Sequence, residues 1–187
     1  MPLKTNASGI QDGQQVPEVP ADDEWTLETE RLLLAPMTES DAEELHELRI
    51  LDSDAPADDG PDVSLQRVRA RIRQWERRRS PDGAEVWLNW TLRLKLDQSV
   101  VGRMQATVAD QRADMAWVIG RRFRNRGYAT EAGRCIAAWL LGFFNLGEVR
   151  ATIHPENPAS QGVATNLGMR RSGKRTNDGD EVWACRP

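Results

Sequence analysis

A short basic turn at residues 124–129 has the clearest chemical potential in the sequence. It reads Arg-Asn-Arg-Gly-Tyr-Ala and lies between a strand-like segment at 115–119 and a segment with helical spacing at 130–144. A helix that begins there leaves its first backbone N–H groups unpaired at the positive end of its dipole, where phosphate oxygens bind well. Gly127 permits close approach of a ligand because it has no Cβ, and the arginines add charge-assisted donors. The turn therefore predicts a site for a diphosphate group.

Two polar residues follow the next strand-like segment, at residues 149–153. Asn157 and Ser160 stand in the sequence His-Pro-Glu-Asn-Pro-Ala-Ser, at the start of a short helix predicted at residues 159–166. Each side chain is a good N-terminal cap of that helix, and contact with a bound ligand is the role that the family resemblance given below implies. Both roles can coexist in one residue, so the sequence leaves the choice open.

Asp114 is a candidate for proton transfer on the strength of the family resemblance given below, in which many relatives hold an acidic residue on the strand before the turn. Such a carboxylate can take the proton of an ammonium group through an intervening water. It lies on the strand-like segment that leads into the basic turn. The alternative is an exposed carboxylate that belongs to the hairpin turn at residues 110–112. Glu85 and Glu131 are weaker candidates, and the helix dipole already explains an acid in the first helical turn, where Glu131 stands.

These residues need a scaffold, and the hydrophobic spacing predicts a mixed sheet. Alternation of apolar and polar residues predicts strands near 86–95, 100–108 and 113–119, and their short connections imply an antiparallel meander. Residues 129–143 instead place apolar side chains on one helical stripe. Strand, turn, helix and the strand at 149–153 form a crossover unit, so the strands before and after the helix are predicted to be parallel.

The chain before this region divides into a tail and the start of one domain. Residues 1–24 carry almost no large apolar side chains, so we predict a disordered tail, followed by a single domain at 25–187. The loop at 52–62 breaks a helix and concentrates aspartates. The other predicted elements are a strand at 26–37, a helix that begins at 38–41, a helix at 65–75, and a hairpin at 169–174 and 181–185.

Two blocks of sequence resemble one known family. Arg124, Gly127 and Ala129 fill the fixed positions of R/Q-x-x-G-x-G/A, the coenzyme A-binding pattern of the GNAT acetyltransferase superfamily. The block at 154–169 resembles the ribosomal-protein N-acetyltransferase-like subgroup, in which N-x-x-S precedes a short helix that ends in Leu-Gly-Met or Leu-Gly-Phe. The two blocks have the order and separation of the family, and the resemblance covers about residues 26–186.

The resemblance implies a fold of the α/β class, of α+β type. It is a mixed, mostly antiparallel sheet of six to seven strands, with helices on both faces and a splayed central strand pair. In the family the pantetheine arm of acetyl-coenzyme A inserts between the splayed strands and pairs with their backbone. The implied contacts with this co-substrate are Trp117, Val118, Ile119, Arg124, Asn125, Arg126, Gly127, Tyr128, Ala129, Thr130, Asn157 and Ser160.

The implied reaction is transfer of an acetyl group from acetyl-coenzyme A to a primary amine, with Asp114, Ser160 and Asn157 as catalytic residues. The sequence departs from the commoner pattern, because Ala164 stands where many members carry a general-acid tyrosine. A thiol pKa near 8.5 makes an unprotonated thiolate a tolerable leaving group at neutral pH. We therefore expect direct attack on the thioester, with Ser160 or a water donating the proton.

The acceptor amine is less determined. The aspartates at 52–62 would attract a cationic amine, which favours a small cationic molecule, although a solvated loop is the plainer interpretation. Trp87 could form a wall of the acceptor pocket. Two alternatives stay open: Nα-acetylation of a protein N-terminus of ribosomal type, and a non-catalytic module that binds acyl-coenzyme A, which the missing tyrosine suggests.

Composition narrows the partners and the location. The chain of 187 residues has 25 basic and 29 acidic side chains and a net charge of −4, which argues against general nucleic-acid binding. No apolar run reaches the roughly 20 residues that span a bilayer, and the N-terminus lacks a signal pattern. A cytoplasmic protein without nucleic-acid or membrane partners is therefore expected.

The remaining residue types suggest neither a disulfide nor a metal site. Cys135 and Cys185 are expected to be reduced thiols, and His46 and His154 show no metal-ligand spacing. A homodimer is common among members of the family, but no residue of this chain demonstrates one.

Overall fold

The computed structural model describes residues 9–11, 14–51 and 64–187 of the chain. Its centre is an eight-stranded sheet. In spatial order the strands are β3 (Leu27–Glu28), β4 (Leu32–Pro36), β5 (Val86–Leu94), β6 (Val100–Ala109), β7 (Arg112–Ile119), β8 (Glu148–Ile153), β10 (Glu181–Cys185) and β9 (Arg170–Arg175). Neighbouring strands are antiparallel except β7 and β8, which run parallel as predicted. A separate antiparallel pair joins β1 (Gly9–Gln11) and β2 (Gln14–Val16).

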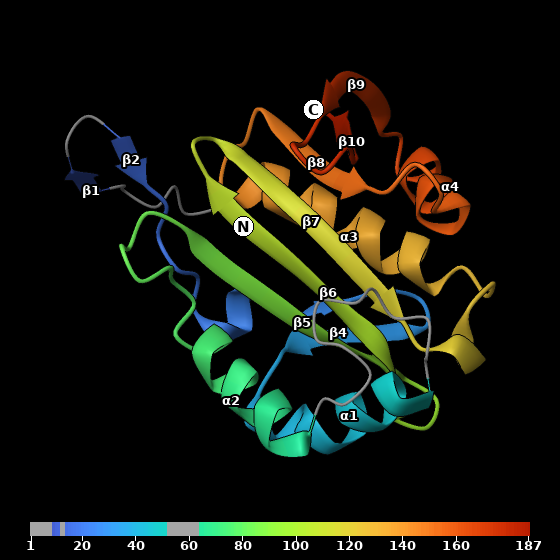
Figure 1. Cartoon of the computed structure of the whole chain (residues 1–187). Coiled ribbons are helices and arrows are strands. Elements are labelled where there is room, and N and C mark those ends of the chain that lie inside the picture. The colour runs from blue at the N-terminus through green and yellow to red at the C-terminus, as the bar shows by residue number, and fades with distance from the viewer. Residues whose placement is uncertain (1–8, 12–13, 52–63) are drawn as a thin grey trace.

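Helices cover both faces of this sheet, which confirms the predicted fold class. The helices are α1 (Ala42–Leu51), α2 (Leu65–Trp75), α3 (Tyr128–Phe143) and α4 (Pro158–Asn166), with short 3-10 turns η1 (Asp22–Glu24), η2 (Glu39–Asp41) and η3 (Arg121–Phe123). Figure 1 shows α3 behind the central strands, and α1 and α2 together at their lower ends. No helix in the described ranges is both long and apolar enough to cross a membrane.

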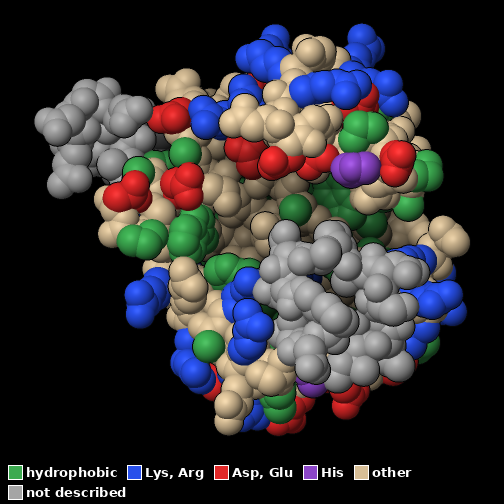
Figure 2. Space-filling view, in the orientation of Figure 1, with side chains coloured by type: hydrophobic (Ala, Val, Ile, Leu, Met, Phe, Trp, Pro, Cys, Tyr) green, Lys and Arg blue, Asp and Glu red, His purple; other side chains and the backbone are tan. Residues whose placement is uncertain are grey.

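The central meander β5–β6–β7 follows the predicted alternation. Alternate residues of β5, from Val86 to Leu92, are buried on the face that α3 covers. β6 and β7 are joined at Asp110 and Gln111, with φ of +46° and +58°, a turn geometry that matches the twist of the flanking strands. The other face of the meander is covered only in part, and Figure 2 shows it hollowed near its centre.

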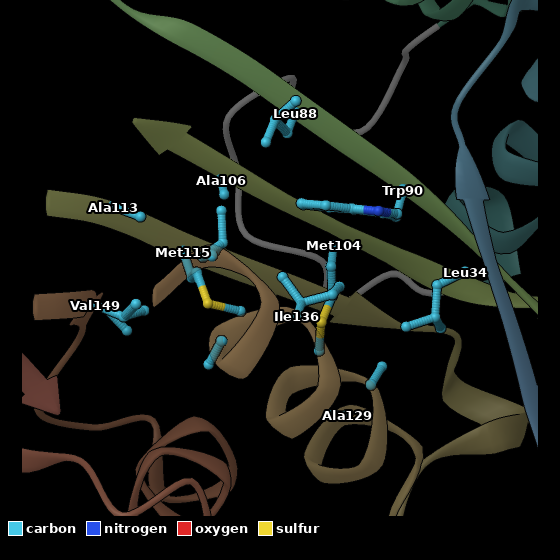
Figure 3. Packing of buried hydrophobic residues seen from close by; sticks show 14 of the residues in the cluster. Leu34, Leu88, Trp90, Met104, Ala106, Ala113, Met115, Ala129, Ile136 and Val149 are labelled. Carbon is cyan, nitrogen blue, oxygen red and sulfur yellow. The ribbon is translucent and has the colours of Figure 1, made fainter. Parts of the chain in front are cut away.

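The main core lies between the sheet and α3, as Figure 3 shows. Ile136 from α3 points toward Met104 of β6, and Trp90 and Leu34 close the space around them. All four side chains are fully buried. Burial of each such side chain contributes about 1.5–3 kcal/mol, so α3 is held firmly against the sheet.

A smaller core lies under α1 and α2. Leu45 of α1 and Ile72 of α2 are among its buried residues. Beside it, the carboxylate of Asp41 accepts hydrogen bonds from Thr91 Oγ1 at 2.9 Å and from Arg93 Nη2 at 2.7 Å. These hydrogen bonds link the start of α1 to β5, and they fix the position of α1 relative to the sheet.

The predicted strand at 26–37 is wrong as a continuous element. The chain turns back between β3 and β4, and Thr29 N–H donates to Leu32 O at 2.9 Å to close the turn. The three leucines that the sequence presents as a strand centre belong to β4 alone. The sheet accordingly has eight strands rather than the six to seven expected.

The predicted disordered tail also ends too late in the sequence. Residues 17–24 pack on the domain: Arg79 Nη2 donates to Pro17 O at 2.9 Å, Arg78 pairs with Asp22, and Pro20 is buried. Their composition hides this order because the partners are arginines far along the chain. The rest of the tail at 1–8 and 12–13, and the aspartate-rich loop at 52–62, lie outside the described residues.

Candidate active site

The parallel strands β7 and β8 separate soon after they meet. Only Arg112, Ala113 and Asp114 of β7 pair with β8. On its other edge, β8 pairs with β10 through five consecutive residues, so it remains an ordered strand. Figure 1 shows β8 turning away from β7 toward α4. The second half of β7 therefore borders a gap in the sheet, which is the splayed pair that the family resemblance implies.

The main chain of β7 faces this gap at every second residue. Gly120 N–H donates to Val101 O on β6 at 2.9 Å, and successive residues of a strand direct their main-chain groups to opposite sides. The N–H groups of Trp117 and Ile119 therefore point away from β6, toward the gap. The predicted contact at Val118 differs, because its main chain is directed to its partner Arg103 on β6.

Helix α3 opens next to this gap with unpaired amides. Gly127 precedes it with φ of +81°, a conformation that glycine adopts without strain. Glu131 N–H donates to Gly127 O at 2.9 Å, and no side chain of a described residue caps this end. The N–H groups of Tyr128, Ala129 and Thr130 thus remain open at the positive end of the helix dipole, which is a favourable place for phosphate oxygens.

The turn before α3 is basic and tightly folded. Asn125 has φ of +60°, and a second residue with positive φ, Gly127, follows two positions later, which brings amides toward one side of the chain. Arg124 folds back so that its Nε donates to Ile119 O at 3.1 Å. The guanidinium of Arg126 lies 6.0 Å from the ring centroid of Phe123. Positive charge therefore surrounds the open amides, which favours an anion.

The start of α4 lies beyond the end of β8, on the other border of the gap. Asn157 caps this helix, because its Oδ1 accepts from Ser160 N–H at 3.0 Å. The capping role is thus confirmed for Asn157, while ligand contact by Asn157 or Ser160 stays a prediction. Ala164 is fully buried at the position where the family often has a tyrosine, so nothing there can donate a proton from its side chain.

Asp114 lies on the face of β7 that is turned away from α3. Its side chain is 48% exposed, and its Oδ2 lies 3.7 Å from Arg112 Nε. Since Asp114 is the last β7 residue that pairs with β8, it stands where the gap begins. It belongs to the strand and not to the hairpin turn, and its role as a proton acceptor stays a prediction.

A row of side chains crosses the open sheet face at Asp114. Trp87 pairs with Thr107, and Thr107 pairs with Asp114, so the three side chains project from the same face of neighbouring strands. Trp87 Nε1 donates to Glu85 Oε2 at 2.8 Å. Glu85 is thus engaged in orienting the indole. Figure 2 shows acidic side chains along the upper border of the hollow on this face.

One contact beside the turn at residues 124–129 has no signal in the sequence. Glu131, in the first turn of α3, accepts hydrogen bonds from Thr29 Oγ1 at 2.6 Å and from Arg31 Nε at 2.7 Å. Burial raises the pKa of Glu131, but these hydrogen bonds and the charge of Arg31 outweigh it and hold the pKa below its usual 4.5. No local pattern signals this contact, because Thr29 precedes Glu131 by 102 positions.

Neither cysteine is part of this arrangement. Cys135 and Cys185 are free and half-buried, and burial raises the pKa of both thiols. Such thiols are poor nucleophiles near neutral pH. Among the described residues, no group of three or more His, Cys, Asp or Glu side chains could hold a metal ion.

The sequence is similar to that of known acetyltransferases. The family model of the acetyltransferase (GNAT) domain matches residues 31–170. Over 73 residues the chain is 37% identical to the uncharacterized N-acetyltransferase YnaD of Bacillus subtilis strain 168, a match that covers 37% of this chain and 43% of the relative. The chain thus aligns with less than half the length of this curated relative.

The fold is similar to that of solved structures across most of the chain. Mycobacterium smegmatis RimJ in complex with coenzyme A disulfide has a TM-score of 0.72 and 18% identity, over 87% of this chain and 88% of that one. RimL, a ribosomal L7/L12 alpha-N-protein acetyltransferase in complex with coenzyme A, has a TM-score of 0.69 and 14% identity, over 86% of this chain and 97% of that one. At these identities the likeness shows a shared fold.

Proposed function

The chain belongs to the GNAT acetyltransferase family, and from this membership we propose that it transfers an acetyl group from acetyl-coenzyme A to a primary amine of a small cationic molecule. The observation that carries the proposal is the gap between β7 and β8, which opens beside the uncapped start of α3. The two features together suit a ligand with an extended arm at one end and a diphosphate at the other.

The residues present fit the co-substrate. The amides of Tyr128, Ala129 and Thr130 would hold the diphosphate, with Arg124 and Arg126 adding positive charge. Acetyl-coenzyme A, when bound, supplies the acetyl group as an activated thioester. In the gap the arm would be shielded from water. It would run along β7, because an extended chain can pair with an open strand edge.

The proposed catalytic roles follow from the position of each group. Asp114 would take a proton from the incoming ammonium through a water, since only a neutral amine is nucleophilic. One of the N–H groups of Trp117 and Ile119 would donate to the oxygen on which negative charge develops, and the other would pair with the extended arm. Ser160 or a water would protonate the departing thiolate. No strong acid is required for that step, because a thiolate is a tolerable leaving group.

The choice of acceptor rests on charge. Acidic side chains border the hollow on the open sheet face (Figure 2), and Trp87 of β5 presents an aromatic ring held by Glu85. A cation is attracted both by carboxylates and by the face of an indole ring. The second candidate is Nα-acetylation of a protein N-terminus, which the fold likeness to RimL suggests, since an N-terminal ammonium carries the same charge.

The test is a screen for acetyl-dependent release of free thiol. The purified chain is incubated with acetyl-coenzyme A and a panel of polyamines, aminoglycoside-like amines and short peptides with free N-termini. Release that depends on a small cationic amine supports the proposal, and release with peptides alone supports the second candidate. If calorimetry detects binding of coenzyme A but no amine gives turnover, the chain is a binding module and the proposed activity is wrong.

A further inference from the structure

Arg31 reaches the phosphate-binding turn from a distant part of the chain. It lies in the turn between β3 and β4, 100 positions before Glu131. The packing of β3 and β4 beside the start of α3 brings the two together. Nothing in the coenzyme A-binding pattern at residues 124–129 includes this arginine, so its place beside the site is a property of the folded domain.

The carboxylate of Glu131 holds Arg31 in one orientation. Its Oε2 accepts from Arg31 Nε at 2.7 Å and lies 2.6 Å from Arg31 Nη2. Its Oε1 accepts from the Arg31 backbone N–H at 2.9 Å and from Thr29 Oγ1 at 2.6 Å. Charge-assisted bonds of this kind are roughly twice as strong as neutral ones, so the guanidinium plane is pinned at the first turn of α3.

The pinned guanidinium lies against the turn itself. Its Cζ is 4.6 Å from the ring centroid of Tyr128, and a Cβ placed on Gly127 would lie 3.5 Å from its Nη2. The side chain is 44% exposed, so a ligand can reach it. Glu131 occupies Nε and one side of Nη2, and none of the residues that the structure describes accepts a hydrogen bond from Nη1. Donors therefore remain for a further anion.

The charges explain why an arginine is needed here. Glu131 is the acidic residue in the first turn of α3, and an unpaired carboxylate there would repel a diphosphate at the same helix end. Arg31 neutralises that charge and has donors left over. We infer that Arg31 binds the diphosphate of the co-substrate and that Glu131 is the positioning residue that aims it, an assignment that rests on the proposed function. The competing explanation is a structural ion pair that only holds the β3–β4 turn against α3 and makes no contact with a ligand.

The test compares two arginines that both anchor α3. Arg31→Gln removes the inferred ligand, and Arg31→Lys keeps the charge but loses the fork-shaped contact. Arg134→Gln is the matched control, because Arg134 holds α3 through hydrogen bonds to Asn166 O at 3.3 and 3.0 Å and has no part in the turn. Calorimetry measures binding of coenzyme A and of dephospho-coenzyme A, which keeps the diphosphate but lacks the 3′-phosphate. Steady-state kinetics give the kcat and KM of each variant, and thermal unfolding shows whether each variant is folded.

The expected result is that Arg31→Gln weakens both ligands alike, by about ten- to a hundredfold, as loss of a hydrogen bond to a charged group predicts. The KM for acetyl-coenzyme A should rise by a similar factor while kcat changes less than about threefold. Arg31→Lys should recover part of the loss, and Arg134→Gln should bind as the parent chain does.

Three outcomes would overturn the inference: unchanged binding in Arg31→Gln, a loss for coenzyme A but not for dephospho-coenzyme A, or a fall in kcat at constant KM. A parent chain that binds no coenzyme A at all would instead refute the proposed function, so the two failures are distinguishable.

Discussion

The start of α3 and the open face of the sheet at Asp114 are built in opposite ways. The first is a contiguous run of chain, in which Gly127 sets the backbone and the next three amides follow directly. The second is a row of side chains from three strands, joined only by the register Trp87–Thr107–Asp114. A motif search can therefore find the proposed cofactor end of the site, whereas the proposed acceptor end exists only after the sheet has formed.

The two regions also differ in what a substitution can disturb. At Gly127 the backbone itself is constrained, because φ of +81° is costly for any residue with a Cβ. At Asp114 the backbone is ordinary strand and the side chain is half-exposed, so a change there alters chemistry and leaves packing intact. Substitutions at the first region should affect binding, and those at the second should affect turnover.

The largest effect is expected for Gly127→Asp. Strain from the left-handed backbone costs about 1–2 kcal/mol. Two like charges near 4 Å add up to about 4 kcal/mol at the effective dielectric of a protein surface. The strain lowers stability, whereas the charge repulsion of about 4 kcal/mol should weaken coenzyme A binding about a thousandfold, because the new carboxylate would stand beside the bound phosphate oxygens. Calorimetry and the thiol-release assay both measure this loss.

The control for Gly127→Asp is Gly179→Asp in the β9–β10 connection. Gly179 also has positive φ, +88°, and an added Cβ there would meet no atom within 4 Å. It should cost stability through the same strain and leave cofactor binding unchanged. Equal loss of binding in both variants would show that the effect at Gly127 is unfolding and not loss of a phosphate site.

A smaller effect is expected for Asp114→Asn. Removal of a general base costs about 10²- to 10⁴-fold, and a base that acts through water should fall near the lower limit. We expect kcat to fall about a hundredfold at neutral pH, with coenzyme A affinity within about threefold of the parent. Raising the pH should restore part of the rate, because more of the amine is then neutral.

Asp110→Asn tests whether removal of any carboxylate near this hairpin lowers kcat as Asp114→Asn should. Asp110 pairs with the same arginine, Arg112, at 3.3 Å, but it lies in the turn and outside the row that crosses the sheet. The kcat of Asp110→Asn should match that of the parent chain. A hundredfold loss in both variants would mean that Arg112 and its ion pairs matter, and the role proposed for Asp114 would fail.

The smallest effect concerns the stability that Glu131 contributes. Its pKa lies below the usual 4.5 in the folded chain, so its charged form stabilises the fold above that pH and loses the contribution as the pH falls through the folded pKa. Urea unfolding from about pH 7 to about pH 3 should show that the difference in unfolding free energy between the parent and Glu131→Gln is constant at first. It should then shrink in acid. A difference that grows in acid contradicts this account.

Much of the fold could be predicted from the sequence because its signals are local. Period-two alternation located β5, β6 and β7, and helical spacing located α2 and α3. The prediction failed where the signal was ambiguous. Residues 26–37, with three leucines at 32–34, indicated one long strand, but the turn that begins at Thr29 divides this segment into β3 and β4. Residues 17–24 looked disordered because their order depends on Arg78 and Arg79, which no local pattern reveals.

The site divides in the same way. By itself the sequence determined the turn at residues 124–129 that we propose to bind phosphate, since the positive φ of Gly127 and the open amides after it depend on neighbours within a few positions. Only the tertiary structure decided that Val118 turns its main chain to β6, that Asp114 stands in a row with Trp87, and that Arg31 reaches Glu131. Those facts depend on strand register and on packing between segments up to about a hundred residues apart, and such contacts are set by burial of the whole core.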